Sequence, residues 1–311
     1  MTQQLAAVTA TMNFVVYFED AAISGWIRER TRRIGEKHPS RVIVLDDTRA
    51  PAVEAPDAGS ARSEWIEVGT QGCDGGSLAA TISAHALPEA PLVLAWIASK
   101  ISADDRFPAL AKRAHTVICN SSVTDVGSNS LRDFIEFAGK HPGIDVQDLA
   151  YVRLHAWQDL IAEFFDEERV LEDLFKLRNV EITAGSEAEA YYLLGWLASR
   201  LEWAACGKER MCNREKETIT FSIHRDGAPR RISRVALMTD STTYTARVFD
   251  EDPNVARVEV TGTHPQRPRC IPLHDLDVAS LIGRAILQTR RDPVFHETLT
   301  LTKRLLDSQR S

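Results

Sequence analysis

The sequence lacks the short motifs that mark the best-known nucleotide-binding and hydrolytic enzymes. It has no G-x-G-x-x-G and no G-K-S/T, the glycine-rich loops that hold the phosphates of dinucleotides and triphosphates. It has no H-E-x-x-H zinc motif and no G-x-S-x-G nucleophile elbow. A catalytic triad has no fixed spacing, and nothing in the sequence points to one. These absences argue against nucleotide-dependent, zinc-dependent and serine-dependent catalysis.

Long apolar runs and an excess of positive charge are also missing. No segment approaches the ~20 apolar residues of a membrane-spanning helix, and residues 1–7 lack the cationic start and apolar run of a signal peptide. The net charge of -7 disfavours general binding to nucleic acid or to an anionic membrane. We therefore expect a cytoplasmic, globular protein that binds neither nucleic acid nor membranes.

Cysteine is scarce, and the five cysteines form an odd, scattered set: Cys73, Cys119, Cys206, Cys212 and Cys270. Such a set is typical of reduced thiols and not of a disulfide framework. His224 follows Cys206 and Cys212, but zinc sites usually begin with a closer cysteine pair and need four ligands. We expect free thiols and no metal site.

The first half of the chain alternates strand and helix signals. Apolar runs predict strands at residues 12–18, 41–45, 65–68, 92–97 and 116–119, with helices at 23–37 and 78–87. Strands that are apolar on both faces and separated by helices indicate a parallel sheet covered on both sides. We expect a doubly wound, mostly parallel, Rossmann-like α/β domain over residues 1–145.

The second half, residues 146–311, predicts an α+β domain. A strand is expected at residues 179–183, followed by a helix with a capping box formed by Ser186 and Glu189. Two antiparallel hairpins follow, the first with strands at 218–224 and 231–238 around Asp226-Gly227, and the second with strands at 243–249 and 256–261. A strand at 270–273 and helices through residue 306 complete this domain.

The turn after the first strand argues against a bound cofactor. In dinucleotide-binding folds this turn carries the pyrophosphate, but here it holds Glu19 and Asp20. We therefore expect no cofactor.

A glycine-rich connection is the best candidate for an anion site. Gly72, Gly75, Gly76 and Ser77 lie between a strand and a helix, where backbone N–H groups can form an anion-binding nest. Asp74 opposes an anion in this loop, and a simple tight connection is the competing interpretation.

Two basic clusters stand out. The first helix carries Arg28, Arg30, Arg32, Arg33 and Lys37, interspersed with glutamates, which is typical of a solvated face. The first hairpin carries Arg225, Arg230, Arg231 and Arg234. This second cluster is either a docking patch for an acidic partner or a device that keeps an edge strand from pairing with other chains.

Aromatic residues on two helices are either core or interface residues. Trp157 shares an apolar stripe with Leu160, Ile161 and Phe164, which favours the core. Trp196 lies on a second apolar helix, and tryptophan is enriched at interface hot spots.

Four separated segments resemble one protein family. Residues 148–157 (DLAYVRLHAW) with Phe165-Asp166, residues 11–16 (TMNFVV), residues 38–41 (HPSR) and residues 195–203 (GWLASRLEW) are similar in order and spacing to motifs of the glucose-6-phosphate dehydrogenase assembly protein family, OpcA. The sequence departs from that family's pattern at Tyr151, Gln158, Ala95 and Asn120. Each departure removes charge or ring area from a candidate contact surface.

The resemblance implies a non-enzymatic protein that binds glucose-6-phosphate dehydrogenase and promotes its active oligomer or its substrate affinity in the oxidative pentose phosphate pathway. The candidate contact residues are Asp148, Arg153, His155, Trp157, Trp96, Trp196 and the four arginines of the first hairpin. The alternative is an enzyme that acts on a phosphorylated sugar or nucleotide in the crevice of the first domain, where Ser121 and Ser122 follow the fifth strand.

Overall fold

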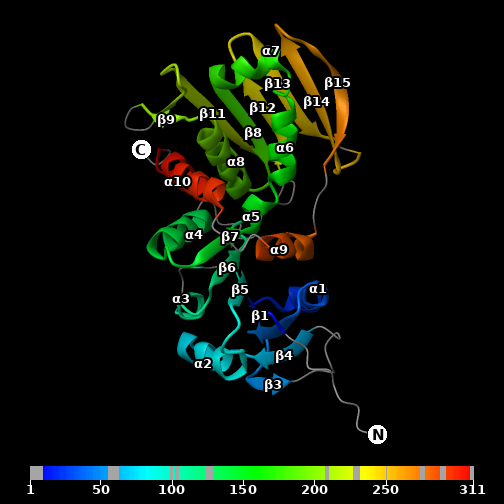
Figure 1. Cartoon of the computed structure of the whole chain (residues 1–311). Helices are drawn as coiled ribbons and strands as arrows, with labels where there is room; N and C mark the ends of the chain where they lie inside the picture. The colour runs from blue at the N-terminus through cyan, green and yellow to red at the C-terminus, as the bar shows by residue number, and fades with distance from the viewer. Residues whose placement is uncertain are drawn as a thin grey trace. The chain divides into compact units, whose positions relative to one another are not determined.

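The computed structural model of the protein describes residues 10–54, 63–98, 101, 105–122, 129–206, 210–226, 232–249, 251–273, 277–287 and 292–308. The chain divides into two compact units (Figure 1). The first comprises residues 1–120, 136–149 and 276–290, and the second comprises residues 121–135, 150–275 and 291–311. Each unit combines three separate stretches of the chain, so this division does not test a single domain boundary near residue 145. That boundary stays a prediction.

The first unit is built on a seven-stranded sheet in the order β3-β4-β2-β1-β5-β6-β7. The parallel strands are β1 (Met12–Phe18), β2 (Ser40–Asp46), β4 (Ser63–Gly69), β5 (Leu92–Ile97), β6 (Thr116–Cys119) and β7 (Asp145–Asp148), and β3 (Ala52–Glu54) is antiparallel to β4. Every residue of β1 is buried, as expected for a central strand covered on both faces. The predicted doubly wound sheet is confirmed.

Helices cover both faces of this sheet (Figure 1). The 3₁₀ helix η1 (Ala21–Ile23) leads into α1 (Ser24–Lys37), which packs beside α9 (Val278–Leu287). On the other face α2 (Gly75–His85) packs beside α3 (Arg106–Ala111). The second half of α4 (Asn129–Lys140) also belongs to this unit, where Phe137 packs edge-on against Phe107.

The second unit holds an eight-stranded, mostly antiparallel sheet in the order β15-β14-β13-β12-β8-β11-β10-β9. Its strands are β8 (Asn179–Ala184), β9 (Ala204–Ala205), β10 (Met211–Cys212), β11 (Thr218–Arg225), β12 (Ile232–Met238), β13 (Thr242–Val248), β14 (Val255–Gly262) and β15 (Gln266–Pro272). The second predicted hairpin is confirmed, because β13 pairs antiparallel with β14.

The first predicted hairpin is wrong. β8 lies between β11 and β12, running parallel to β11 and antiparallel to β12. Val180, Ile182 and Ala184 of β8 are fully buried, so this strand gains the most apolar burial at the centre of the sheet. Burial of a central strand therefore outweighs the local turn preference of Asp226-Gly227.

Helices lie on one face of the second sheet (Figure 1). The longer helices are α6 (His155–Glu163), α8 (Glu187–Arg200) and α10 (Pro293–Ser308). The short helix α5 (Leu149–Val152) precedes α6 in the chain, and α7 (Glu168–Leu171) and the 3₁₀ helix η2 (Glu172–Lys176) follow α6. α8 packs on β8 and β11, and α10 packs on α8. A side chain at Gly195 would place its Cβ 2.1 Å from Oγ1 of Thr302, so glycine permits the close approach of α8 and α10.

The N-terminus of α8 is as predicted in position but not in its hydrogen bonds. Ser186 occupies the N-cap, but its side chain makes no capping hydrogen bond among the described residues. Glu189 pairs instead with Arg153, so the capping box is not formed.

The expectation that all cysteines are free is also wrong. Cys206 and Cys212 form a disulfide with a Cα–Cα distance of 5.6 Å. The short antiparallel pair of β9 and β10 brings the two residues within disulfide range. Cys73, Cys119 and Cys270 are free, as expected. None of the described helices combines the length and apolarity needed to cross a lipid bilayer.

Candidate functional site

Doubly wound folds bind ligands at the carboxyl ends of their parallel strands, so this edge of the first unit is the place to look for a site. β1 ends at Phe18, and Glu19 and Asp20 follow directly. The Asp20 carboxylate accepts a hydrogen bond from the backbone N–H of Ala22 at 2.9 Å and caps η1. A negative charge therefore lies at the turn where dinucleotide folds hold a pyrophosphate.

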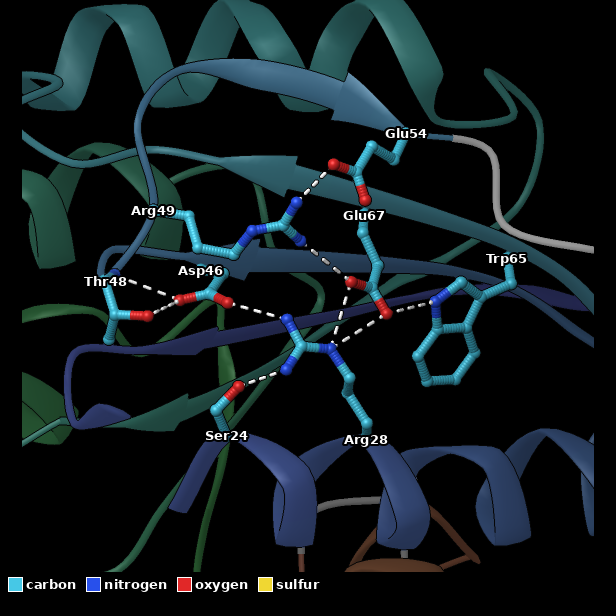
Figure 2. A network of polar contacts seen from close by, with 8 residues as sticks. All are labelled: Ser24, Arg28, Asp46, Thr48, Arg49, Glu54, Trp65 and Glu67. Atoms are coloured by element: carbon cyan, nitrogen blue, oxygen red, sulfur yellow. Dashed lines mark hydrogen bonds and ion pairs between the residues drawn. The ribbon is translucent and has the colours of Figure 1, made fainter. Parts of the chain in front are cut away.

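The end of β2 is occupied by an ion pair (Figure 2). Asp46, the last residue of β2, is fully buried. One carboxylate oxygen accepts from the Arg28 guanidinium at 2.8 Å, and the other accepts from the backbone N–H of Thr48 at 3.0 Å and from its hydroxyl. In nucleotide-binding folds an acidic residue in this region binds the ribose, but both oxygens of Asp46 are already engaged.

Glu67 of β4 extends this network (Figure 2). Its carboxylate accepts from Nε of Arg28 at 3.0 Å, from Arg49 at 3.3 Å and from the indole N–H of Trp65 at 3.0 Å. Arg49 also pairs with Glu54. Side chains from α1, β2, β4 and the following loops thus fill this part of the sheet edge with partnered charges.

Arg28 is held more tightly than the sequence indicates. Burial alone would lower its pKa, but hydrogen bonds and charges from Glu67 and Asp46 outweigh burial and raise the pKa above its ordinary value. The expectation that the arginines of the first helix form a solvated face is wrong for Arg28. Its guanidinium contacts the Ser24 hydroxyl one helical turn earlier and pairs with the carboxylates of Asp46 and Glu67. We name the residues shown in Figure 2 the Arg28 network: Ser24, Arg28, Asp46, Thr48, Arg49, Glu54, Trp65 and Glu67.

Two carboxylates, one in the glycine-rich loop and one before α3, accept hydrogen bonds from backbone N–H groups of this loop. The Asp74 side chain accepts from the backbone N–H of Ser77 at 2.7 Å and caps α2, and this bond holds the pKa of Asp74 below its ordinary value. The N–H of Gly75 donates to Asp105 at 3.2 Å. Gly72 has a φ of +75°, which explains glycine at that turn. Gly76 lies at the start of α2. Carboxylates of the chain itself accept from N–H groups of this loop, so we do not propose it as an anion site.

The residues near the fifth parallel strand and the family motif are also engaged. Ser122 is buried, and its hydroxyl accepts from Arg153 at 3.2 Å. Arg153 pairs in addition with the buried carboxylate of Glu189. Asp148 ends β7 and is fully buried. Together with burial, its charge raises the pKa of the Cys119 thiol. Asp148 and the Arg153–Glu189 pair therefore belong to the interior of the protein and not to an exposed contact surface.

The aromatic candidates lie in cores. Trp157 is 6% exposed, as its apolar stripe predicts. Trp96 is 3% exposed and stacks on Tyr17 with a centroid distance of 4.3 Å. His155 contacts Tyr151 edge-on and is half-buried, as is Trp196. Of these three tryptophans, Trp196 is exposed enough to contact a partner, whereas Trp96 and Trp157 are buried.

The basic hairpin candidates are separated by β8. Arg225 ends β11 and is exposed, while Arg234 lies on β12 and pairs with Glu181 of β8 at 3.1 Å. Arg230 and Arg231 lie outside the described residues. The expected cluster of four arginines therefore stays a prediction. Among the described residues, Arg234 lies next to Arg247 of β13 and Glu181 of β8.

The described helices lie on one face of this sheet (Figure 1), and Arg234 lies on the opposite face, which we call the uncovered face. Residues alternate along β12, β13 and β14, and the helix-covered positions are buried, including Val235, Ala246 and Val258. The opposite face presents Arg234, Arg247 and Arg257, which are directly opposite one another on adjacent strands. We name these three residues the arginine row. Sequence reasoning missed Arg247 and Arg257, although the alternation of both strands assigns them to the exposed face.

A separate groove of about 240 Å³ lies between α1 and α9. Arg33, Lys37, His38 and Arg284 line it together with Asp277, which caps α9 by accepting from the N–H of Ser280. Arg33 and Lys37 lie in the C-terminal half of α1 and Arg284 lies on α9, so the groove is distinct from the Arg28 network near the start of α1. Among the described residues, His, Cys, Asp and Glu side chains form no group of three suited to a metal ion.

Solved structures share the fold. KijD10, a 3-ketoreductase from Actinomadura kijaniata solved with NADP, superposes with a TM-score of 0.55 at 12% identity, covering 96% of both chains. An NAD binding oxidoreductase from Klebsiella pneumoniae gives 0.54 at 11% identity, again over 96% of both chains. An oxidoreductase from Sinorhizobium meliloti gives 0.51 at 13% identity, over 96% of this chain and 97% of that one. At these identities the likeness concerns the fold alone.

Curated relatives come from cyanobacteria. A protein of Synechocystis named "Putative OxPP cycle protein OpcA" is 33% identical over 119 residues, which is 38% of this chain and 25% of the relative. A protein of the same name from Nostoc punctiforme is 34% identical over 118 residues, 36% of this chain and 24% of the relative. The matched region thus spans about a quarter of each relative.

Two family models match in order along the chain. The glucose-6-phosphate dehydrogenase subunit N-terminal domain matches residues 31–136, and the corresponding C-terminal domain matches residues 144–299. Together they include most of both sheets and three of the four motif segments noted in the sequence. The chain belongs to the OpcA family of glucose-6-phosphate dehydrogenase assembly proteins.

Proposed function

We propose that this chain is a non-enzymatic protein that binds glucose-6-phosphate dehydrogenase and promotes the enzyme's active oligomer or its substrate affinity. Family membership supports the choice of partner. The observation that carries the non-enzymatic part is the Arg28 network, whose partnered side chains occupy the end of β2. An activator of this kind acts by binding the competent state of the enzyme more tightly than its other state.

The competing function is catalysis on a phosphorylated sugar or nucleotide in the same fold. It would need free hydrogen-bonding groups and a positive field at the sheet edge. Asp20 instead places a carboxylate after β1, both oxygens of Asp46 are taken, and the α2 cap is filled by Asp74. No observation in the described part of the chain favours this alternative over a binding role.

Two measurements on the purified chain test the proposal. Size-exclusion chromatography with light scattering, performed with glucose-6-phosphate dehydrogenase in the same sample, should reveal a complex heavier than either protein. Calorimetric titration of the chain alone with NAD⁺ or NADP⁺ should give no saturable heat. Separate elution of the two proteins would remove the partner, and a saturable nicotinamide isotherm would remove the non-enzymatic assignment.

A further inference from the structure

We propose that the arginine row is the surface through which the chain docks onto a carboxylate-rich surface of its protein partner. This inference rests on the proposed function, because it takes glucose-6-phosphate dehydrogenase as that partner. It assigns binding to Arg234, Arg247 and Arg257 on the uncovered face of the second unit's sheet.

The strand register sets the geometry of the row. Arg234 of β12 is opposite Arg247 of β13, and Arg247 is opposite Arg257 of β14. Side chains directly opposite on antiparallel strands have Cβ atoms about 5 Å apart. The buried neighbours Val235 and Ala246 face the helices, so the arginines project together from the other side of the sheet.

The charges of the row are only partly compensated. Glu181 pairs with Arg234 at 3.1 Å. In the part of the chain that the structure describes, no ion pair reaches Arg247 or Arg257, and Nε of Arg257 is shielded from solvent without a hydrogen-bond partner. Like charges directly opposite one another are unfavourable, and so is a shielded donor without an acceptor. Carboxylates supplied by a partner would relieve the repulsion between the guanidinium groups.

The surroundings of the row favour a protein surface as the occupant. The same face carries the half-buried Thr243 and Thr245 on β13, and a broad sheet face of this kind suits another folded surface. Glu181 and Glu259 share the face, and the net charge of -7 disfavours a polyanion such as nucleic acid. A second copy centred on the row would bring the uncompensated arginines together.

The test compares two charge-reversed variants of equal charge change. Arg247→Glu/Arg257→Glu reverses the row. Lys303→Glu/Arg304→Glu reverses two exposed cations of α10, which belongs to the helix layer of the same unit. Biosensor measurements at low and high salt give the affinity and association rate of each for glucose-6-phosphate dehydrogenase. Thermal unfolding monitors the fold, and Arg247→Thr/Arg257→Thr serves as a second, neutral variant.

We expect the row variants to bind about tenfold or more weakly than wild type, because loss of cross-interface charge pairs slows association and speeds release. The α10 variant should bind as wild type does, and salt should weaken wild type most. If wild type binds and the row variants bind equally well, the docking surface is refuted and the proposed function stands. An equal loss in the α10 variant, or self-association of wild type through the row, also refutes it. If wild type does not bind the dehydrogenase at all, the proposed function fails and takes this inference with it.

Discussion

Arg28 connects two carboxylates on neighbouring strands, Asp46 at the end of β2 and Glu67 two residues before the end of β4. Asp46 is fully buried and pairs with this guanidinium, while the side chain of Glu67 is 10% exposed and pairs with both Arg28 and Arg49. Removing one partner from a buried pair costs more than an intact pair contributes, because the remaining charge stays desolvated. The Arg28 network is therefore expected to stabilise the first unit.

The first prediction follows from that dependence. Arg28→Met should lower the free energy of unfolding by about 3 kcal/mol at neutral pH, measured by urea denaturation. The matched control is Arg33→Met on the same helix, whose pair with Glu29 is exposed and should contribute less than ~1 kcal/mol. Equal stability losses in the two variants would contradict the importance given to the Arg28 network.

His38 supplies a prediction on pH. Burial, and then the charge of Lys37, lower its pKa in the folded chain. The unfolded state, with a histidine pKa of about 6.5, then binds the proton more readily, so stability should fall as pH drops through the region just below that value. His38→Gln should flatten the melting temperature over this range. An unchanged pH profile in the variant would show that His38 is not responsible.

At the scale of elements, the sequence predicted those parts whose signal is local. The buried run of β1, the N-cap position of α8 and the β13–β14 hairpin were all visible in residue order. The insertion of β8 between β11 and β12 was not, because it joins residues far apart in the chain and depends on burial of a complete strand. The arginine row was not predicted for the same reason, because only strand pairing places Arg247 beside Arg234 and Arg257 beside Arg247.

In the candidate site, too, the features set by local sequence could be predicted, and those that depend on distant residues could not. The carboxylates after β1 could be read directly from the sequence, and they lie where expected. Arg28 was assigned to a solvated face, because its partners Asp46 and Glu67 come from strands that a helical pattern alone does not identify. Trp157 could be placed by its apolar stripe, but the burial of Asp148 and Arg153 could not be derived from their polar character.

Trp157 gives a prediction at the level of its helix. Trp157→Ala should lower the free energy of unfolding by about 3–5 kcal/mol, because the variant leaves a large cavity beneath α6. Leu171→Ala is a suitable control, since Leu171 is 47% exposed and its truncation should have little effect. A Trp157→Ala variant with the wild-type melting temperature would place the indole outside the core.

The sheet of the second unit gives another prediction. Arg247→Thr should raise the free energy of unfolding by about 0.2–1 kcal/mol, because it removes one member of a like-charged cross-strand set. The gain should shrink at high salt, where the repulsion in wild type is screened. Loss of stability at both salt concentrations would indicate that packing of the Arg247 side chain outweighs its charge.

At the scale of the whole molecule, the chain shares its fold with solved oxidoreductases, while the function proposed for it is the binding of another enzyme. The KijD10 structure contains NADP. In this chain the Arg28 network occupies the carboxyl end of β2, one of the positions where doubly wound folds bind ligands. In the described part of the second unit the helices lie on one face of the sheet, and the opposite face carries the arginine row. A fold can keep its architecture while its sites change function.

The most direct test of the central claim is the steady-state rate of glucose 6-phosphate oxidation at limiting substrate. It is measured for the dehydrogenase alone, for this chain alone, and for the two together. We predict no turnover by this chain alone and a higher rate for the mixture than for the dehydrogenase, through a lower KM or a larger fraction of active oligomer. Turnover by this chain alone, or an unchanged rate in the mixture, would contradict the account.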